Sequence, residues 1–166
     1  STAEYNLAVG TTALDAITTG DYNTAMGYNA LTANTSGASN IAIGYGAYDA
    51  ADDESDNLAI GRDALGGAVN GGVQNVAIGN YSLDALTSGQ YNVAVGYSAL
   101  TENTNGQRNT AIGHSSLLAT TSGANNTAIG HQSLRWSTTA SFNIALGAKS
   151  LYANTTGTRN VALGTY

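Results

Sequence analysis

The two histidines are the side chains of this chain best suited to bind a metal. His114 and His131 are the only histidines of the 166-residue sequence. Imidazole nitrogens are common ligands of zinc and other transition metals. The pair is therefore a candidate metal site, completed by the same residues of neighbouring chains if the protein is an oligomer. The simpler interpretation is a pair of exposed side chains at equivalent positions of a repeat.

The acidic segment Asp52-Asp53-Glu54, followed by Asp56, is a candidate calcium site because carboxylate oxygens are the ligands that calcium prefers. The alternative is a solvated loop. Elsewhere the sequence offers little chemistry, since it has no cysteine and no phosphate-binding loop. No nucleophile, base and orienting group recur together in a convergent arrangement, as an active site requires. We therefore expect a protein that is not an enzyme and has no cofactor beyond these candidate metals.

Aromatic residues recur at fixed positions and are the candidate ligand contacts. Tyr28, Tyr45 and Tyr97 lie in the same repeat position as the two histidines, and Trp136 is the single tryptophan. Such side chains combine an apolar ring with a polar tip and can stack on sugars. We expect these four residues to bind glycans. Alternatively, they join adjacent corners of the fold or fill grooves between chains.

A five-residue phrase, Asn-x-Ala-aliphatic-Gly, organises the whole chain. Its ten copies recur with a constant period, lengthened by a single residue between the fourth and fifth copies, and they open at Asn6, Asn23, Asn40, Asn57, Asn75, Asn92, Asn109, Asn126, Asn143 and Asn160. A fixed period of this kind is typical of solenoids. The sequence thus predicts a single repeat domain over residues 1–166, an all-β parallel β-solenoid or β-roll of ten 17-residue coils.

The positions of the repeat, numbered from its Asn, indicate the local structure. Position three is always Ala and position five always Gly, around β-branched or aliphatic residues that favour an extended strand. Position nine is Leu in every copy except Tyr48, and its segment is either a second short strand, which we favour, or one helical turn. The Asn at position one is either a turn former or part of a ladder of stacked amides, comprising Asn23, Asn40, Asn57, Asn75, Asn92, Asn109, Asn126 and Asn143.

Charge and patterning constrain the partners. A net charge of −6 with five Lys and Arg argues against nucleic acid, which demands a positive surface. No apolar run is long enough to insert into a membrane. Positions two and four of the phrase face one side of the pleat and position three the other, yet all three are apolar or small. Since one coil has one interior, we expect another chain to cover the second face, which predicts a homo-oligomer.

The repeats resemble those of two families of fibrous proteins. Two units, Asn23-Thr24-Ala25-Met26-Gly27-Tyr28-Asn29-Ala30-Leu31 and Asn109-Thr110-Ala111-Ile112-Gly113-His114, are similar to repeats in the heads of trimeric autotransporter adhesins. They are even more similar to arrays in phage tail-fibre proteins, where a corner such as Asn154-Thr155-Thr156-Gly157 recurs. The resemblance implies a left-handed, homotrimeric solenoid located outside the cell, on a virion tail fibre or a cell surface. It also implies attachment to a host surface.

Three functions are therefore expected in order of preference. The first is a fibrous attachment protein that spaces or presents glycan contacts, with this chain as a segment of a longer fibre. The second is an extracellular filament whose uncapped subunits stack end to end. The third is ice binding by rows of Thr, which Leu, Ile and Val interrupt at position two.

Overall fold

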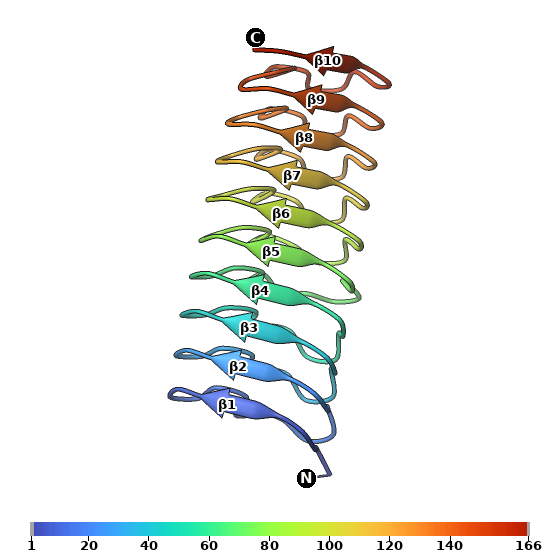
Figure 1. Cartoon of the computed structure of the whole chain (residues 1–166). Helices are drawn as coiled ribbons and strands as arrows, with labels where there is room; N and C mark the ends of the chain where they lie inside the picture. The colour runs from blue at the N-terminus through green and yellow to red at the C-terminus, as the bar shows by residue number, and fades with distance from the viewer. Residues whose placement is uncertain (1, 166) are drawn as a thin grey trace.

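The computed structural model describes residues 2–165 as a stack of ten short parallel strands joined by turns (Figure 1). Each strand forms one rung of a single sheet, and the strands follow one another in sequence order from β1 to β10. Their bounds are β1 Leu7–Val9, β2 Thr24–Met26, β3 Ile41–Ile43, β4 Leu58–Ile60, β5 Val76–Ile78, β6 Val93–Val95, β7 Thr110–Ile112, β8 Thr127–Ile129, β9 Ile144–Leu146 and β10 Val161–Leu163. This is the expected all-β parallel solenoid. At the usual spacing between strands the stack is about 45 Å long.

The central Ala of each strand points into the coil. Ala94 and Ala111 are fully buried and lie opposite each other in the register, as do the corresponding alanines of all neighbouring strands. The Gly that closes the strand is equally constrained, because a Cβ on Gly113 would lie 2.6 Å from the carbonyl oxygen of Gly130 and φ is +128° there. Ala and Gly are thus selected by the close approach of successive coils.

The second half of each repeat is a chain of turns, so the strand that we favoured is wrong, and so is the helical turn. Residues two apart adopt left-handed φ angles, for example Gln132 at 57° and Leu134 at 49°. Neither a strand nor a right-handed helix contains such angles. A left-handed residue costs about 1–2 kcal/mol, and the Leu at this position offsets the cost because it is buried in the interior.

Asparagines at position one form a hydrogen-bonded ladder along the stack. The Oδ1 atom of Asn109 accepts the backbone N–H of Asn126 at 3.0 Å and its Nδ2–H at 3.1 Å. The Nδ2 atom of Asn109 donates to the carbonyl oxygen of Gly123 at 2.7 Å. Each amide therefore joins its own coil to the next, and the buried side chain leaves neither polar atom without a partner.

The irregular coils are adjacent to one another. The buried Tyr48 replaces the usual Leu, and its hydroxyl oxygen accepts a hydrogen bond from Nδ2 of Asn57 at 2.6 Å. Glu54 replaces the corner Gly, and its carboxylate accepts the N–H of Gly71 at 2.7 Å. Gly71 lies in the turn region 66–74 of the longer coil. The extra residue is absorbed there, so β4 and β5 keep the register Ala59 to Ala77.

Positions two and four of the strands point outward and form an apolar surface, which we call the sheet face. Ile112, Ile129 and Ile144 are among its exposed members, and none of the twenty side chains at these positions is charged. In the single chain, therefore, strands β2 to β9 bury only the side that carries their central Ala. No helix capable of spanning a membrane occurs within residues 2–165.

Candidate binding surfaces

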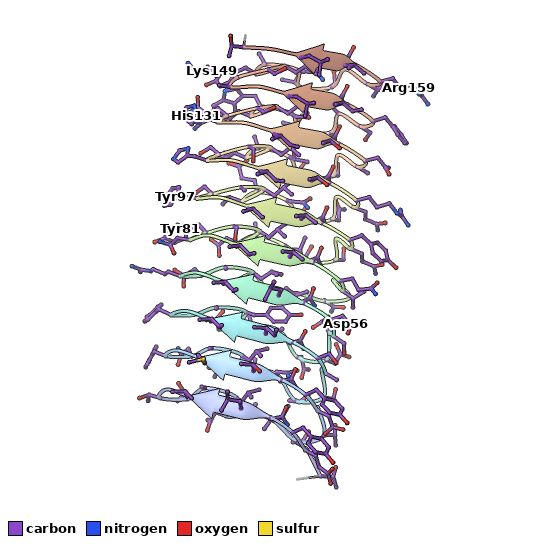
Figure 2. All side chains as sticks on the ribbon, viewed as in Figure 1. Asp56, Tyr81, Tyr97, His131, Lys149 and Arg159 are labelled. Carbon is purple, nitrogen blue, oxygen red and sulfur yellow. The ribbon has the colours of Figure 1, made fainter. Side chains whose placement is uncertain are left out.

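A row of aromatic and cationic side chains follows the edge of the stack just after the strands. Figure 2 shows Tyr81, Tyr97 and His131 along this edge. We call the row the position-six row, although Tyr81 comes from position seven of its coil. In chain order its members are Tyr28, Tyr45, Arg62, Tyr81, Tyr97, His114 and His131.

Contacts within the position-six row include stacked rings, edge-on rings and a guanidinium placed between two tyrosines. Tyr28 and Tyr45 stack with centroids 5.3 Å apart. The Arg62 guanidinium carbon lies 5.3 Å from the centroid of Tyr45 and 6.0 Å from that of Tyr81. Tyr97 meets Tyr81 edge-on at 5.7 Å. Because neighbouring rings cover part of each other's faces, a sugar would contact mainly their outward edges and hydroxyl groups.

The structure brings together only part of the predicted glycan set. Tyr28 and Tyr45 are adjacent, and Tyr97 joins them through Arg62 and Tyr81, which the sequence analysis did not single out. Arg62 could have been found, since it occupies position six of its repeat. Trp136 lies outside the row. Its indole meets Tyr152 edge-on at 6.5 Å, and the guanidinium carbon of Arg135 lies 5.0 Å from its ring centroid.

The histidines extend the same row and place two imidazoles side by side. His114 and His131 lie 5.3 Å apart between ring centroids, and His114 stacks on Tyr97 at the same distance. Within the described part of the chain no group of three or more His, Cys, Asp or Glu side chains is arranged to hold a metal ion. Further ligands for this pair, from other copies of the chain for instance, would be needed to bind a metal tightly.

The predicted calcium ligands do not converge. The Glu54 carboxylate is buried and accepts hydrogen bonds from the backbone N–H groups of Asp52 and Gly71. Oδ1 of Asp52 instead accepts the hydroxyl of Thr35 at 2.5 Å. The buried carboxylate thus caps backbone groups, a structural role that its replacement of a corner Gly did not reveal.

Two partly buried carboxylates, Asp49 and Asp84, lie on the coils on either side of the coil that carries Asp63. Partial burial raises the pKa of Asp49 and of Asp84 above the ordinary value, and the charge of Asp63 raises both further. Asp63 itself pairs with Arg62, whose Nε lies 3.1 Å from its Oδ2. The surroundings therefore disfavour the ionised forms of Asp49 and Asp84.

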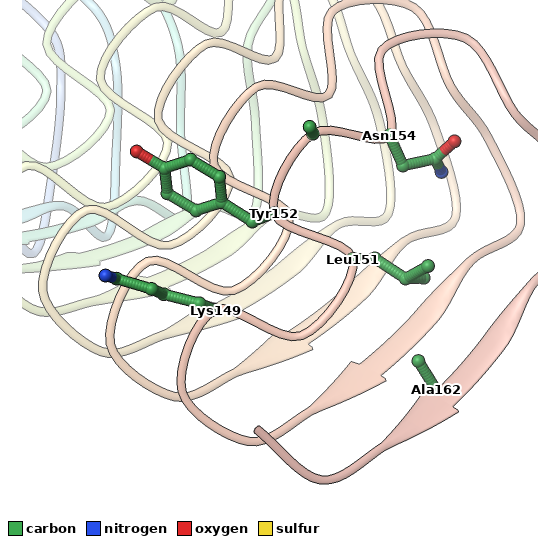
Figure 3. Close-up of a pocket in the computed structure, with 6 residues that line it drawn as sticks. Lys149, Leu151, Tyr152, Asn154 and Ala162 are labelled. Atoms are coloured by element: carbon green, nitrogen blue, oxygen red, sulfur yellow. The ribbon is translucent and has the colours of Figure 1, made fainter. Parts of the chain in front are cut away.

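The C-terminal end of the stack contains an open cavity of about 440 Å³ (Figure 3). Leu151, Asn154 and Ala162 line it together with Lys149, Tyr152 and Ala153. Leu, Asn and Ala at the corresponding positions of inner coils, such as Leu100, Asn103 and Ala111, are fully buried. The cavity is therefore lined by residues of the kinds that are buried between successive coils elsewhere in the stack.

Comparison of this chain with protein-family models, with curated proteins and with solved structures gives no match.

Proposed function

We propose that the chain is a rigid segment of a non-enzymatic attachment fibre outside the cell. In this fibre three copies associate through their sheet faces and present aromatic side chains to a glycan of a host surface. The observation that carries the proposal is the sheet face, an uncharged strip built from positions two and four of all ten strands.

The dimensions of the sheet face support self-association. Ten strands of three residues make a strip of roughly 45 Å by 10 Å. Monomeric soluble proteins rarely expose a continuous apolar patch larger than a few hundred Å², and this strip reaches that size. A second and a third copy are the simplest cover, because they bring the same flat, uncharged surface. Threefold symmetry rests on the resemblance of the repeats to trimeric fibre and adhesin repeats.

The position-six row supports the attachment role. Tyr28, Tyr45 and Tyr97 are each about half exposed, and successive contacts tie them into one line along the stack. A line of phenol edges and hydroxyls offers repeated, equivalent contacts to a sugar chain. Trp136 with Arg135 would provide a separate contact on the upper coils.

A glycan-array experiment with a matched control tests the attachment role. Tyr28→Ala/Tyr45→Ala should abolish the binding of neutral glycans at the position-six row while the circular dichroism spectrum and melting temperature stay unchanged. The control, Tyr5→Ala/Tyr22→Ala, removes a similarly stacked pair, 5.0 Å apart, from a different position of the repeat and should bind normally. Equal loss in both variants, or a lower melting temperature in the first, would assign the tyrosines a structural role instead.

A second candidate function is an end-to-end filament, which the cavity at the C-terminal end of the stack favours. The lining of the cavity matches what each coil presents to the next, so another copy could add its first coil there. Electron microscopy of the isolated chain separates the two functions. Discrete rods about 45 Å long would favour the attachment fibre, and long unbranched filaments would favour assembly.

A further inference from the structure

Charge is distributed unevenly along the stack. Residues 1–84 contain ten acidic and one basic side chain, for a net charge of −9, whereas residues 85–166 contain one acidic and four basic side chains, for +3. Because the strands stack in sequence order, these halves of the sequence are the lower and upper halves of Figure 1. The protein is acidic as a whole, yet its upper half is basic.

The residue just before each Asn forms a second row along the opposite edge, which we call the pre-Asn row. Figure 2 labels Asp56 and Arg159 on this edge. In the lower half the row consists of Tyr5, Tyr22, Ser39, Asp56 and Gln74, and in the upper half of Tyr91, Arg108, Asn125, Phe142 and Arg159. One edge therefore changes from acidic to basic along its length.

Two exposed pairs of a cation and an aromatic ring distinguish the upper half of the pre-Asn row. The guanidinium carbon of Arg108 lies 5.2 Å from the ring centroid of Tyr91, and that of Arg159 lies 5.5 Å from the ring centroid of Phe142. All four side chains are exposed. A guanidinium beside a ring keeps N–H groups available for a carboxylate or a sulfate.

The backbone holds these side chains firmly but does not require them. The pre-Asn residues all have left-handed φ angles, such as 61° at Tyr91 and 60° at Phe142. Gly adopts this conformation at the least cost, and bulky residues there are uncommon. The backbone N–H groups of Arg108 and Arg159 donate to carbonyls of the preceding coil at 3.0 and 3.2 Å. Large exposed side chains at positions where the backbone disfavours them are consistent with a binding role.

We propose that the upper half of the pre-Asn row binds an acidic polysaccharide. Carboxylate or sulfate groups would contact Arg108 and Arg159, and sugar rings would pack against Tyr91 and Phe142. The two arginines are three coils apart, about 14 Å along the stack, which suits a polymer with charges repeated along its length. Asp56 and the acidic coils of the lower half would repel such a polymer and confine it to the upper half. This inference rests on the attachment function and adds to it a second glycan-binding surface on the opposite edge.

Calorimetric titration with defined polymers tests the proposal. Polygalacturonate should bind through carboxylates or dextran sulfate through sulfates, whereas neutral dextran should not bind at this edge. The affinity should fall between about 50 and 200 mM salt, because exposed charges are screened. The tighter of the two acidic polymers identifies the preferred group.

Variants locate the site. Arg108→Gln/Arg159→Gln should weaken binding of the acidic polymer by roughly tenfold or more, since two charge-assisted contacts are lost. Lys149→Gln removes a positive charge of the same half that also lies beside an aromatic ring, but on the other edge, and should change the affinity by less than about twofold. Unchanged circular dichroism spectra establish that the variants are folded.

Three results would overturn the inference: no binding of either acidic polymer, equal effects of the two sets of variants, or tighter binding of a single-stranded oligonucleotide at the same edge. If neutral glycans still bind through Tyr28 and Tyr45, the attachment function stands and only the acidic polysaccharide fails. If no glycan of any kind binds, the attachment function fails as well.

Discussion

Replacing one ladder asparagine, Asn109→Ala, should destabilise the fold strongly. The Asn109 side chain is fully buried, and its amide accepts the backbone N–H of Asn126 and donates to the carbonyl of Gly123. Alanine would leave both backbone groups buried without these partners. An orphaned group of this kind costs about 1–3 kcal/mol, so the two together cost about 2–6 kcal/mol.

The matched control is Asn105→Ala in the preceding coil. The side chain of Asn105 is exposed, so its loss should change the free energy of unfolding by no more than about 0.5 kcal/mol. Urea unfolding followed by circular dichroism measures both variants, and hydrogen exchange of the Asn126 amide reports the local effect. If Asn109→Ala costs no more than the control and the Asn126 amide remains protected, the ladder does not hold the coils together.

Three further substitutions examine other parts of the fold. Ala94→Leu should overpack the coil interior and cost about 1–3 kcal/mol in urea unfolding, whereas the same change at the exposed Ala148, Ala148→Leu, should cost about 0.5 kcal/mol or less; similar values would contradict the interior position of Ala94. Gly113→Ala should cost about 3 kcal/mol or more, because its Cβ meets the next coil at a left-handed φ, and a folded variant of unchanged melting temperature would refute this. Burial and neighbouring carboxylates raise the pKa of Asp84 in the folded protein above 3.8, so its negative charge destabilises the fold at neutral pH. Asp84→Asn should therefore increase the free energy of unfolding at pH 7, by about a few tenths of a kcal/mol at this partly exposed site. The stability gained by the variant should disappear as the pH falls to about 3.8, the pKa of an Asp in the unfolded chain. A gain that increases as the pH falls would contradict the raised pKa.

The regular part of the fold could be predicted from the sequence because each position of the repeat has the same structural environment in every coil. Ala at position three and Gly at position five occur in all ten copies, since any larger side chain would meet the next coil. The constant period of the phrase predicted the stacking of the strands, and the single longer step located the longer coil.

The turns after the strands were not predicted, because their left-handed angles occur at Leu, Tyr and Lys as well as at Gly. Sequence patterns associate such angles with Gly and Asn, so Leu134 and Lys149 gave no signal. Their conformations are set by stacking against the neighbouring coils, a tertiary effect that local propensity does not contain.

The candidate surfaces were predictable only where equivalent positions stack. Tyr28 and Tyr45 were identified through their shared position, and so was the pair of histidines. Arg62 occupies the same position, but its contacts with two tyrosines require the coordinates. Trp136 shares no row with the tyrosines, so a common site for all four predicted residues does not form.

Sedimentation equilibrium of the unmodified chain tests the central claim most directly. If the sheet face is covered by two further copies, the mass in solution should be about three times the 16.7 kDa of the chain. A stable species of 16.7 kDa at micromolar concentration would show that the sheet face stays exposed, and it would contradict the proposed trimeric fibre.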